Sequence, residues 1–190
     1  MASDTNLNSP QVVLKELEQA LSHINEKEAE TLLKSIEDCG KVFLAGAGRS
    51  GLMAKAFCMR LMHMGIHAHV LGETTTSTFE KEDLLILCTG SGETGTLVHY
   101  AKKAKNIGGK IAAITIKPES TVGSLADFVV KMPGAVKERK EGEESTVTVQ
   151  PMGSLFEQSL LLFFDSLILQ YMSKHNLKGD VMYGMHANLE

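Results

Sequence analysis

Five short apolar runs divide the middle of the chain, and none of them alternates apolar with polar residues. A run of this kind is typical of a strand that is covered on both faces of its sheet. Stretches with helical periodicity separate the runs, so the order is a repeated strand, helix, strand. This pattern predicts an α/β fold, a three-layer αβα sandwich around a five-stranded parallel sheet. The predicted strands are residues 42–46, 67–71, 84–88, 111–115 and 128–132.

Helical patterns flank this central region. Ser9 followed by proline indicates the start of a first helix, and Asn25 with Glu28 resembles the cap of a second. Residues 137–150 are charged and lack apolar periodicity, so we expect a surface loop there. Residues 154–172 are apolar on nearly every side, which predicts a helix buried in the core and also against another subunit. We therefore expect a homo-oligomer.

The overall charge argues against nucleic acid as a partner. The chain of 190 residues has a net charge of −4 and a pI near 6, and no run of Lys or Arg provides a basic field. Three cysteines without a CxxC spacing indicate neither a disulfide framework nor a zinc knuckle, which fits a reducing compartment. The N-terminus is polar and no stretch reaches a membrane-spanning length, so we expect a cytoplasmic protein without membrane contact.

A glycine-rich turn with the sequence GAGRSG occupies residues 46–51, after the first predicted strand. Such a turn directs backbone N–H groups and the positive end of a helix at an anion, either a phosphomonoester or a pyrophosphate. Ser50 adds a hydroxyl donor and Arg49 a positive charge. The turn also matches the dinucleotide pattern GxGxxG, for which Glu73 lies at a suitable distance. Close packing of a helix on its strand is a third interpretation of the glycines.

A second turn, CTGSGET at 88–94, follows the third predicted strand and opens another helix. The hydroxyls of Thr89, Ser91 and Thr94 are spaced around two glycines, so they can surround one phosphate with donors and no cation. A helix cap accounts for only one of these hydroxyls, and a dinucleotide fold does not require the arrangement. The second turn therefore favours phosphate binding.

The pair of turns resembles the SIS (sugar isomerase) family, over residues 41–172. In that family a hydroxyl-rich loop holds the phosphate of a phosphosugar, on a flavodoxin- or Rossmann-like fold. We accordingly expect N-terminal helices at 1–40, a phosphosugar-binding domain at 41–175, and a C-terminal tail at 176–190 that joins the site or a subunit interface. The substrate-binding residues are expected to be Gly48, Arg49, Ser50, Thr89, Gly90, Ser91, Gly92, Glu93 and Thr94.

Two further stretches, 151–159 and 185–190, resemble the 6-phospho-3-hexuloisomerases within this family. The resemblance implies conversion of D-arabino-hex-3-ulose 6-phosphate to D-fructose 6-phosphate, in the ribulose monophosphate pathway of formaldehyde fixation. It also implies a homotetramer, arranged as a dimer of dimers. Three other functions stay open on the sequence: a different phosphosugar aldose–ketose isomerase, a non-catalytic phosphosugar sensor, and a small dinucleotide-binding protein.

Two residues are candidates for proton transfer. Glu157, at the start of the apolar helix, either complements the helix dipole or acts as a base in a partly dry site. The resemblance favours the base, which would lift the C2 proton and return a proton to C3. Arg49 is a candidate to steady the enediolate or a sugar oxygen. His186 is on sequence alone an ordinary tail residue. In the resembled family and its relatives a histidine from a late segment reaches the phosphosugar site, often across the subunit boundary. His186 could there transfer protons between oxygens or open the cyclic sugar.

Cofactor chemistry is not expected. His67 and His69 share one face of a predicted strand, but packed or surface positions are favoured over a metal pair because no third ligand has a suitable spacing. The ketone of the implied substrate already acidifies the proton beside it. We therefore expect neither a metal nor an organic cofactor.

Overall fold

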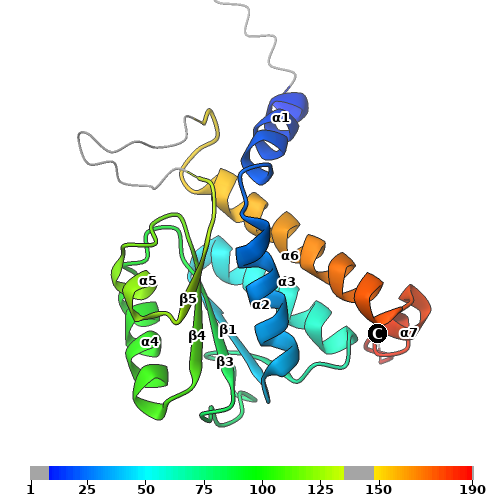
Figure 1. The fold of residues 1–190 in the computed structure, drawn as a ribbon. Helices are drawn as coiled ribbons and strands as arrows, with labels where there is room; N and C mark the ends of the chain where they lie inside the picture. The colour runs from blue at the N-terminus through cyan, green and yellow to red at the C-terminus, as the bar shows by residue number, and fades with distance from the viewer. Residues whose placement is uncertain (1–8, 135–147, 190) are drawn as a thin grey trace, which may run out of the picture.

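Helices flank a central sheet in the computed structural model, which describes residues 9–134 and 148–189 (Figure 1). The predicted loop at 137–150 lies outside the described residues, except for its last part at 148–150. The strands are β1 (Val42–Gly46), β2 (Ala68–Val70), β3 (Leu84–Cys88), β4 (Lys110–Thr115) and β5 (Phe128–Lys131). The helices are α1 (Ser9–Leu21), α2 (Glu26–Asp38), α3 (Gly48–His63), α4 (Gly95–Ile107), α5 (Thr121–Leu125), α6 (Ser154–His175) and α7 (Gly179–Tyr183).

All five strands pair in parallel in the order β2-β1-β3-β4-β5, which confirms the predicted sheet. Each strand agrees with its predicted apolar run to within a residue at either end. Successive side chains of a strand point to opposite faces, and β1 and β3 are buried on both faces, which explains why their sequences do not alternate. The order is that of a doubly wound fold, in which the chain reverses its direction of travel across the sheet between β1 and β3.

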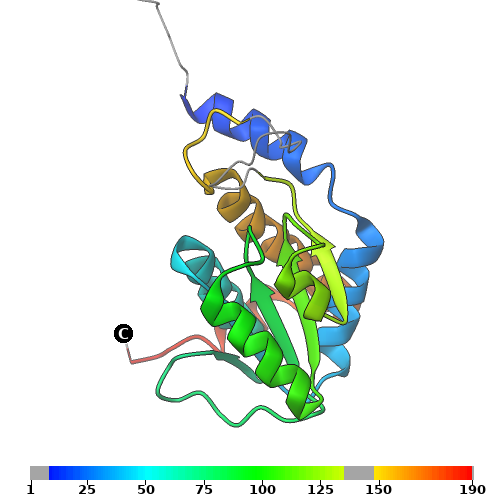
Figure 2. The ribbon, with the colours of Figure 1, turned by 90° about the vertical axis from the view of Figure 1, so that its left-hand side faces the viewer.

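Helices cover both faces of the sheet, as the predicted three-layer sandwich requires. On one face α2, α3 and α6 pack against Leu44 of β1, and the rings of Phe57 and Phe164 stack at 4.1 Å between α3 and α6. On the other face α4 and α5 pack against Phe43 and Leu85. Figure 1 and Figure 2 show the three layers from two sides.

The second helix begins at the predicted cap, although not with the predicted partner. Asn25 Oδ1 accepts a hydrogen bond from the backbone N–H of Lys27 at 2.9 Å, which satisfies one free donor of the first turn. Glu28 does not complete a reciprocal cap. Its Oε2 instead accepts from the backbone N–H of Lys131 at 2.8 Å, so this carboxylate ties α2 to β5.

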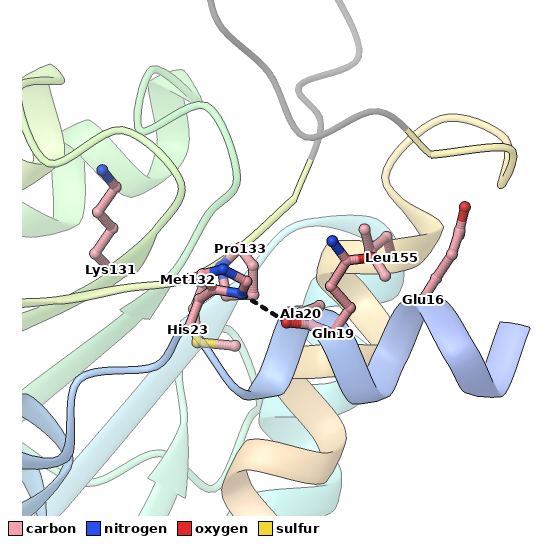
Figure 3. A pocket seen from close by; sticks show the side chains of 8 residues that line it. All are labelled: Glu16, Gln19, Ala20, His23, Lys131, Met132, Pro133 and Leu155. Carbon is pink, nitrogen blue, oxygen red and sulfur yellow. Dashed lines mark hydrogen bonds between the residues drawn. The ribbon is translucent and has the colours of Figure 1, made fainter.

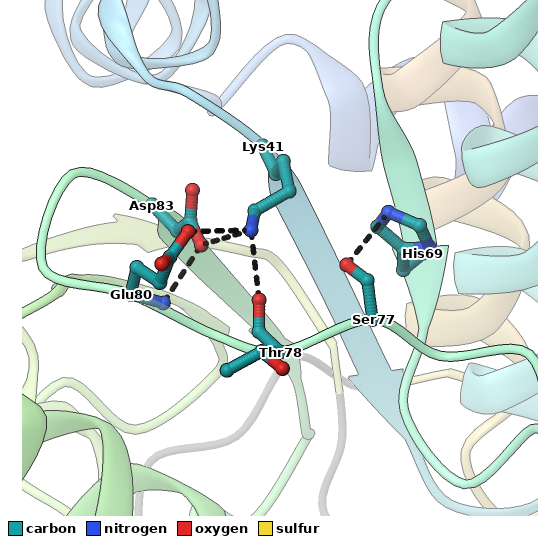
Figure 4. Close-up of polar contacts among 6 residues, drawn as sticks. All are labelled: Lys41, His69, Ser77, Thr78, Glu80 and Asp83. Atoms are coloured by element: carbon teal, nitrogen blue, oxygen red, sulfur yellow. Dashed lines mark hydrogen bonds and ion pairs between the residues drawn. The ribbon is translucent and has the colours of Figure 1, made fainter.

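The connection from β2 to β3 contains no helix, and a polar cluster fastens it to the start of β1 (Figure 4). Lys41 Nζ donates to the carbonyl of Thr78 at 2.8 Å and lies 2.9 Å from Glu80 Oε2 and 3.4 Å from Asp83 Oδ2. The buried Asp83 also accepts from the backbone N–H of Glu80 at 2.8 Å. These contacts fix the segment just before β3 enters the sheet.

The long apolar helix is α6, which continues past the predicted residue 172 and ends where Asn176 adopts a left-handed conformation. Its core face is buried, but Leu162 and Leu169 on the opposite side are 40% and 66% exposed. None of the described helices combines the length and apolar character that crossing a membrane requires.

The first helix packs across the beginning of α6. Leu17 and Ala20 contact Leu155, and Glu16 accepts three hydrogen bonds from the segment that precedes α6. The donors are Thr148 Oγ1, the backbone N–H of Val149 and Gln150 Nε2, at 2.7 to 2.9 Å. α1 therefore holds the entrance to α6 in place.

Candidate functional site

The two glycine-rich turns leave the same edge of the sheet, from neighbouring strands. In the parallel register Gly46 at the end of β1 lies opposite Cys88 at the end of β3. The strand order reverses between these two strands, and ligands of doubly wound sheets bind in the crevice that such a reversal opens. The predicted phosphate-binding residues thus gather at one place in the fold.

The structure requires glycine at different positions of the first turn for different reasons. A Cβ atom on Gly46 would lie 2.8 Å from the backbone nitrogen of Gly51, and one on Gly51 would lie 2.6 Å from the carbonyl oxygen of Gly46. Close packing of α3 on β1 therefore explains these two residues. It does not explain Gly48, which has φ +57° and no atom within 4 Å of the place that a Cβ atom would take. Gly48 leaves the turn open on its outer side.

The helices that follow the two turns both begin without a side-chain cap. Ala47 precedes α3, and Thr94 precedes α4 without making a side-chain capping bond. The first N–H groups of an α-helix have no partner within the helix, and they carry its positive end. Ser50, which is only 9% exposed, lies in the first turn of α3 and adds a hydroxyl there. Two helix ends at one sheet edge form a suitable anion site.

Hydrogen bonds between side-chain hydroxyls and backbone N–H groups within the second turn stabilise its conformation. Thr89 Oγ1 accepts from the backbone N–H of Gly92 at 3.1 Å, and Ser91 Oγ accepts from that of Glu93 at 3.3 Å. Both hydroxyls keep a proton to donate. Glu93 Oε1 accepts from the backbone N–H of Thr121 at 2.8 Å, so this carboxylate fastens the turn to α5.

The second turn also lies against the start of α6. A Cβ atom on Gly90 would lie 3.7 Å from Cδ1 of Phe156 and 3.4 Å from Cδ1 of Ile116. Phe156 directly precedes Glu157, so the carboxylate lies one residue along the helix from a side chain that packs on the turn. The start of α6 and the turn after β3 are therefore neighbours.

Glu157 is joined to the first turn by Arg49. Arg49 Nη1 lies 3.1 Å from Glu157 Oε2 and donates to Ser154 Oγ at 3.0 Å. The Glu157 side chain is 6% exposed, whereas the Arg49 side chain is 53% exposed. The buried carboxylate of Glu157 is therefore paired with a guanidinium group that is itself half exposed to solvent. The structure brings together Arg49 and Glu157, which were both predicted from the sequence, and adds Ser154, which was not.

Ser154 had a detectable signal in the sequence. With Glu157 it forms the pattern S-x-x-E before an apolar helix, which is typical of a helix cap. Gly153 is the cap residue in the structure, and Ser154 lies inside the helix with its hydroxyl turned to Arg49. The capping pattern was therefore visible in the sequence, but the contact of Ser154 with Arg49 on another helix was not.

His186 lies at the other end of α3. Its ring centroid is 5.2 Å from that of His63, the last residue of α3, whereas Arg49 lies in the first turn of that helix. The 16 residues of α3 span about 24 Å at 1.5 Å per residue. Figure 1 shows α7 beside the C-terminal end of α6. Within one chain His186 does not join Glu157, and its expected role in a neighbouring subunit stays a prediction.

The remaining candidates lie outside this site. Glu73 forms a surface ion pair with Lys55 of α3 at 3.0 Å. His67 is exposed, and His69 stacks on Phe43 at 5.1 Å. Figure 4 shows the contact between His69 Nε2 and the Ser77 hydroxyl, 3.1 Å apart. Within residues 9–134 and 148–189, no group of three metal-ligating side chains is found.

A cavity of about 590 Å³ lies between α1, the end of β5 and the start of α6 (Figure 3). A hydrogen-bonding contact of 2.6 Å between His23 Nδ1 and the carbonyl of Gln19 lies at its wall. Its lining includes none of the predicted substrate-binding residues. The lining residues are Glu16, Gln19, Ala20, His23, Lys131, Met132, Pro133 and Leu155.

The fold and the site together define the class of protein. It is an α/β protein with a doubly wound sheet, two glycine-rich turns at one edge of that sheet and a buried carboxylate joined to the first turn. A family model described as the SIS domain matches residues 35–162, which is more than half of the chain. The chain therefore belongs to the SIS-domain family.

Individual relatives resemble the chain over nearly its whole length. A 3-hexulose-6-phosphate isomerase of Bacillus subtilis is 51% identical over 178 residues, which cover 94% of this chain and 95% of that protein. A 3-hexulose-6-phosphate isomerase of Mycobacterium gastri is 36% identical, with 100% and 94% covered. The crystal structure of a Methanococcus jannaschii protein, described as inferring the function of 3-hexulose-6-phosphate isomerase, matches with a TM-score of 0.80 at 34% identity, covering 95% of this chain and 98% of that one.

Proposed function

We propose that this protein interconverts D-arabino-hex-3-ulose 6-phosphate and D-fructose 6-phosphate. The similarity to 3-hexulose-6-phosphate isomerases of two bacteria supports this substrate. The observation that carries the proposal is the buried carboxylate of Glu157, which Arg49 joins to a glycine-rich turn at the edge of the sheet where β1 and β3 end. The enzyme name also implies a place in the ribulose monophosphate pathway of formaldehyde fixation.

In this proposal the two turns hold the phosphate of the substrate. The hydroxyls of Ser50, Thr89, Ser91 and Thr94 donate to its oxygens, together with the uncapped N–H groups at the starts of α3 and α4. Gly48, whose Cβ position is open, lets the backbone approach the anion, and Gly90 and Gly92 belong to the second proposed binding turn. Glu93 supports the site through its bond to Thr121. The phosphate thereby places the sugar carbons towards the start of α6.

Glu157 is the proposed base for both proton transfers. It takes the proton from C2, whose C–H electron pair becomes the C2–C3 double bond while negative charge moves onto the C3 oxygen. The protonated carboxyl then returns the proton to C3. Transfer of a proton from the C2 oxygen to the C3 oxygen leaves the ketone at C2. Arg49 stabilises the negative oxygen while it exists.

The proposal includes a homotetramer in which the tail of one subunit completes the site of another. Leu52 and Met59 of α3 and Leu162 and Leu169 of α6 are exposed apolar residues on two helices that pack together, which favours a subunit interface there. His186 of the adjacent subunit is then the proposed carrier of the proton between the two oxygens, because the two nitrogens of an imidazole ring can accept a proton and donate one.

A cytoplasmic location also belongs to the proposal. Cys39, Cys58 and Cys88 are all free, which fits a reducing compartment. Burial raises the pKa of the Cys88 thiol at the end of β3, so this thiol stays protonated and unreactive beside the site.

The direct test is turnover of hexulose 6-phosphate by the purified protein. Fructose 6-phosphate is converted by added phosphoglucose isomerase and glucose 6-phosphate dehydrogenase, and the formation of NADPH is followed. We expect saturable turnover that is highest with this sugar in a panel that includes arabinose 5-phosphate and sedoheptulose 7-phosphate. Higher turnover of another phosphosugar would assign a different isomerase. Binding of hexulose 6-phosphate without turnover of any sugar would make the protein a sensor.

A further inference from the structure

The start of α6 carries a sequence that is typical of a helix cap, yet the cap does not form. In the pattern S-x-x-E the serine hydroxyl accepts from the N–H of the glutamate, and the glutamate carboxylate accepts from the N–H of the serine. Here the backbone N–H of Ser154 donates to the carbonyl of Pro151 at 3.2 Å, and that of Glu157 donates to the carbonyl of Gly153 at 3.0 Å. The side chains of Ser154 and Glu157 therefore do not make the two capping hydrogen bonds and can contact other elements.

Both side chains converge on one nitrogen of Arg49. Nη1 donates to Ser154 Oγ at 3.0 Å and lies 3.1 Å from Glu157 Oε2. Ser154 is 6% exposed, so its hydroxyl is held in a buried position where it needs a partner. A local preference that is given up in this way, beside a buried carboxylate, marks a functional arrangement.

The proposed reaction weakens the contact of Arg49 with Glu157 but not its contact with Ser154. When Glu157 takes the C2 proton its carboxyl becomes neutral, and its attraction for the guanidinium of Arg49 falls. The Arg49 side chain is half exposed and has several rotamers available at that moment. The hydroxyl of Ser154 is neutral throughout, so its hydrogen bond to Nη1 does not depend on where the proton is.

We propose that Ser154 is a positioning residue, which keeps Arg49 beside the reacting carbons while Glu157 carries the proton. The inference rests on the proposed isomerase function. Ser154 acts through Arg49 and does not touch the substrate itself. Its contribution falls on the step in which the enediolate charge exists, so it affects kcat much more than KM.

The test is a set of substitutions at Ser154, measured on hexulose 6-phosphate with the full-length protein. Ser154→Ala removes the acceptor, Ser154→Cys keeps a similar volume with a weak acceptor, and Ser154→Thr keeps the hydroxyl. We expect kcat to fall about tenfold in the Ala and Cys variants, as for loss of one hydrogen bond to a charged group, and to stay within about twofold in the Thr variant. Ser173→Ala, at the exposed end of the same helix, is the control and should leave kcat unchanged.

Two further readouts separate positioning from a general structural effect. The affinity for fructose 6-phosphate, measured by calorimetry, should stay within about threefold in all four variants, because phosphate binding does not use Ser154. In a chain that already carries Arg49→Ala, adding Ser154→Ala should change kcat by less than about twofold, because the hydroxyl then has nothing to position. Single-turnover conditions with excess enzyme keep these slow variants measurable.

The outcomes distinguish the inference from the function on which it rests. If the wild-type protein does not turn over the hexulose phosphate, the proposed function fails. If the wild type is active and Ser154→Ala retains its kcat, or if the effect of Ser154→Ala is undiminished in the Arg49→Ala chain, the positioning role is wrong. A joint loss of fructose 6-phosphate affinity and thermal stability, without rescue by threonine, would also contradict it.

Discussion

The side chain of Ser120 occupies the space that a Cβ atom on Gly92 would need. Gly92 has φ +69°, a conformation that glycine adopts without strain, and its carbonyl accepts from the backbone N–H of Val122 at 3.0 Å. Ser120 is itself the cap of α5, where its hydroxyl accepts from the N–H of Gly123. The turn after β3 is therefore packed closely against the start of α5, and this packing sets the position of its hydroxyls.

Gly92→Ala should lower the free energy of unfolding by about 3 kcal/mol, because the left-handed backbone and the collision with Ser120 both disfavour a side chain there. Urea unfolding measures the change. Gly95→Ala is the matched control, since no atom lies near a Cβ at that position. It should alter stability by less than about 1 kcal/mol, in the stabilising direction. Equal effects of the two substitutions would contradict the close packing of this turn on α5.

Asp83→Ala should destabilise the fold by about 2 kcal/mol. The buried carboxylate accepts from the backbone N–H of Glu80 and pairs with Lys41, so its removal leaves that N–H without its acceptor and takes away one of the two carboxylates beside Lys41. Glu82→Ala, which removes only the exposed pair with Lys81, should change stability by less than about 0.5 kcal/mol. Urea unfolding of both variants checks the contrast, and a small effect at Asp83 would show that the cluster does not hold the connection to β3.

His63 should make the fold less stable as the pH falls below about 6.5. Burial, then the positive charge of Arg60 and then His186, lowers the pKa of His63 in the folded protein. The unfolded chain therefore takes up this proton first as the pH falls. Stability then decreases between about 6.5 and the lowered pKa and levels off below it.

Urea unfolding at pH 7.5 and at pH 5.5, values chosen on either side of about 6.5, measures this dependence. The loss of stability between them should be smaller in His63→Gln than in the wild type. His67→Gln, at an exposed position, should keep the wild-type difference. A pH dependence that is the same in wild type and His63→Gln would mean that His63 does not contribute.

Sequence periodicity was sufficient to predict the sheet and its layers. The apolar runs around Leu44 and Ile86 are buried on both faces, and a parallel sheet between two layers of helices is the simplest arrangement that covers such strands. The connection at 71–83 could not be assigned in the same way. It has no periodic pattern, and it is held by Lys41, which lies 37 positions before Thr78 in the sequence.

Only those parts of the candidate site that have a local sequence pattern could be predicted. The turns around Gly48 and Gly92 have their own glycine and hydroxyl patterns, and these residues lie where two neighbouring strands end. Ser154 was missed because its partner, Arg49, is 105 positions away and local capping rules assign its hydroxyl to the helix. The place of His186 beside His63 likewise depends on tertiary packing, which no local pattern reveals.

The most direct test of Glu157 as the base is the turnover number of Glu157→Gln on hexulose 6-phosphate, with the affinity for fructose 6-phosphate measured alongside. The amide keeps the shape of the side chain but cannot take up the C2 proton, so kcat should fall by about 10³-fold while the affinity stays within about threefold. Glu30→Gln, at an exposed acid of α2, should behave as the wild type. A Glu157→Gln enzyme that retains the wild-type kcat would contradict the assignment of Glu157 as the base.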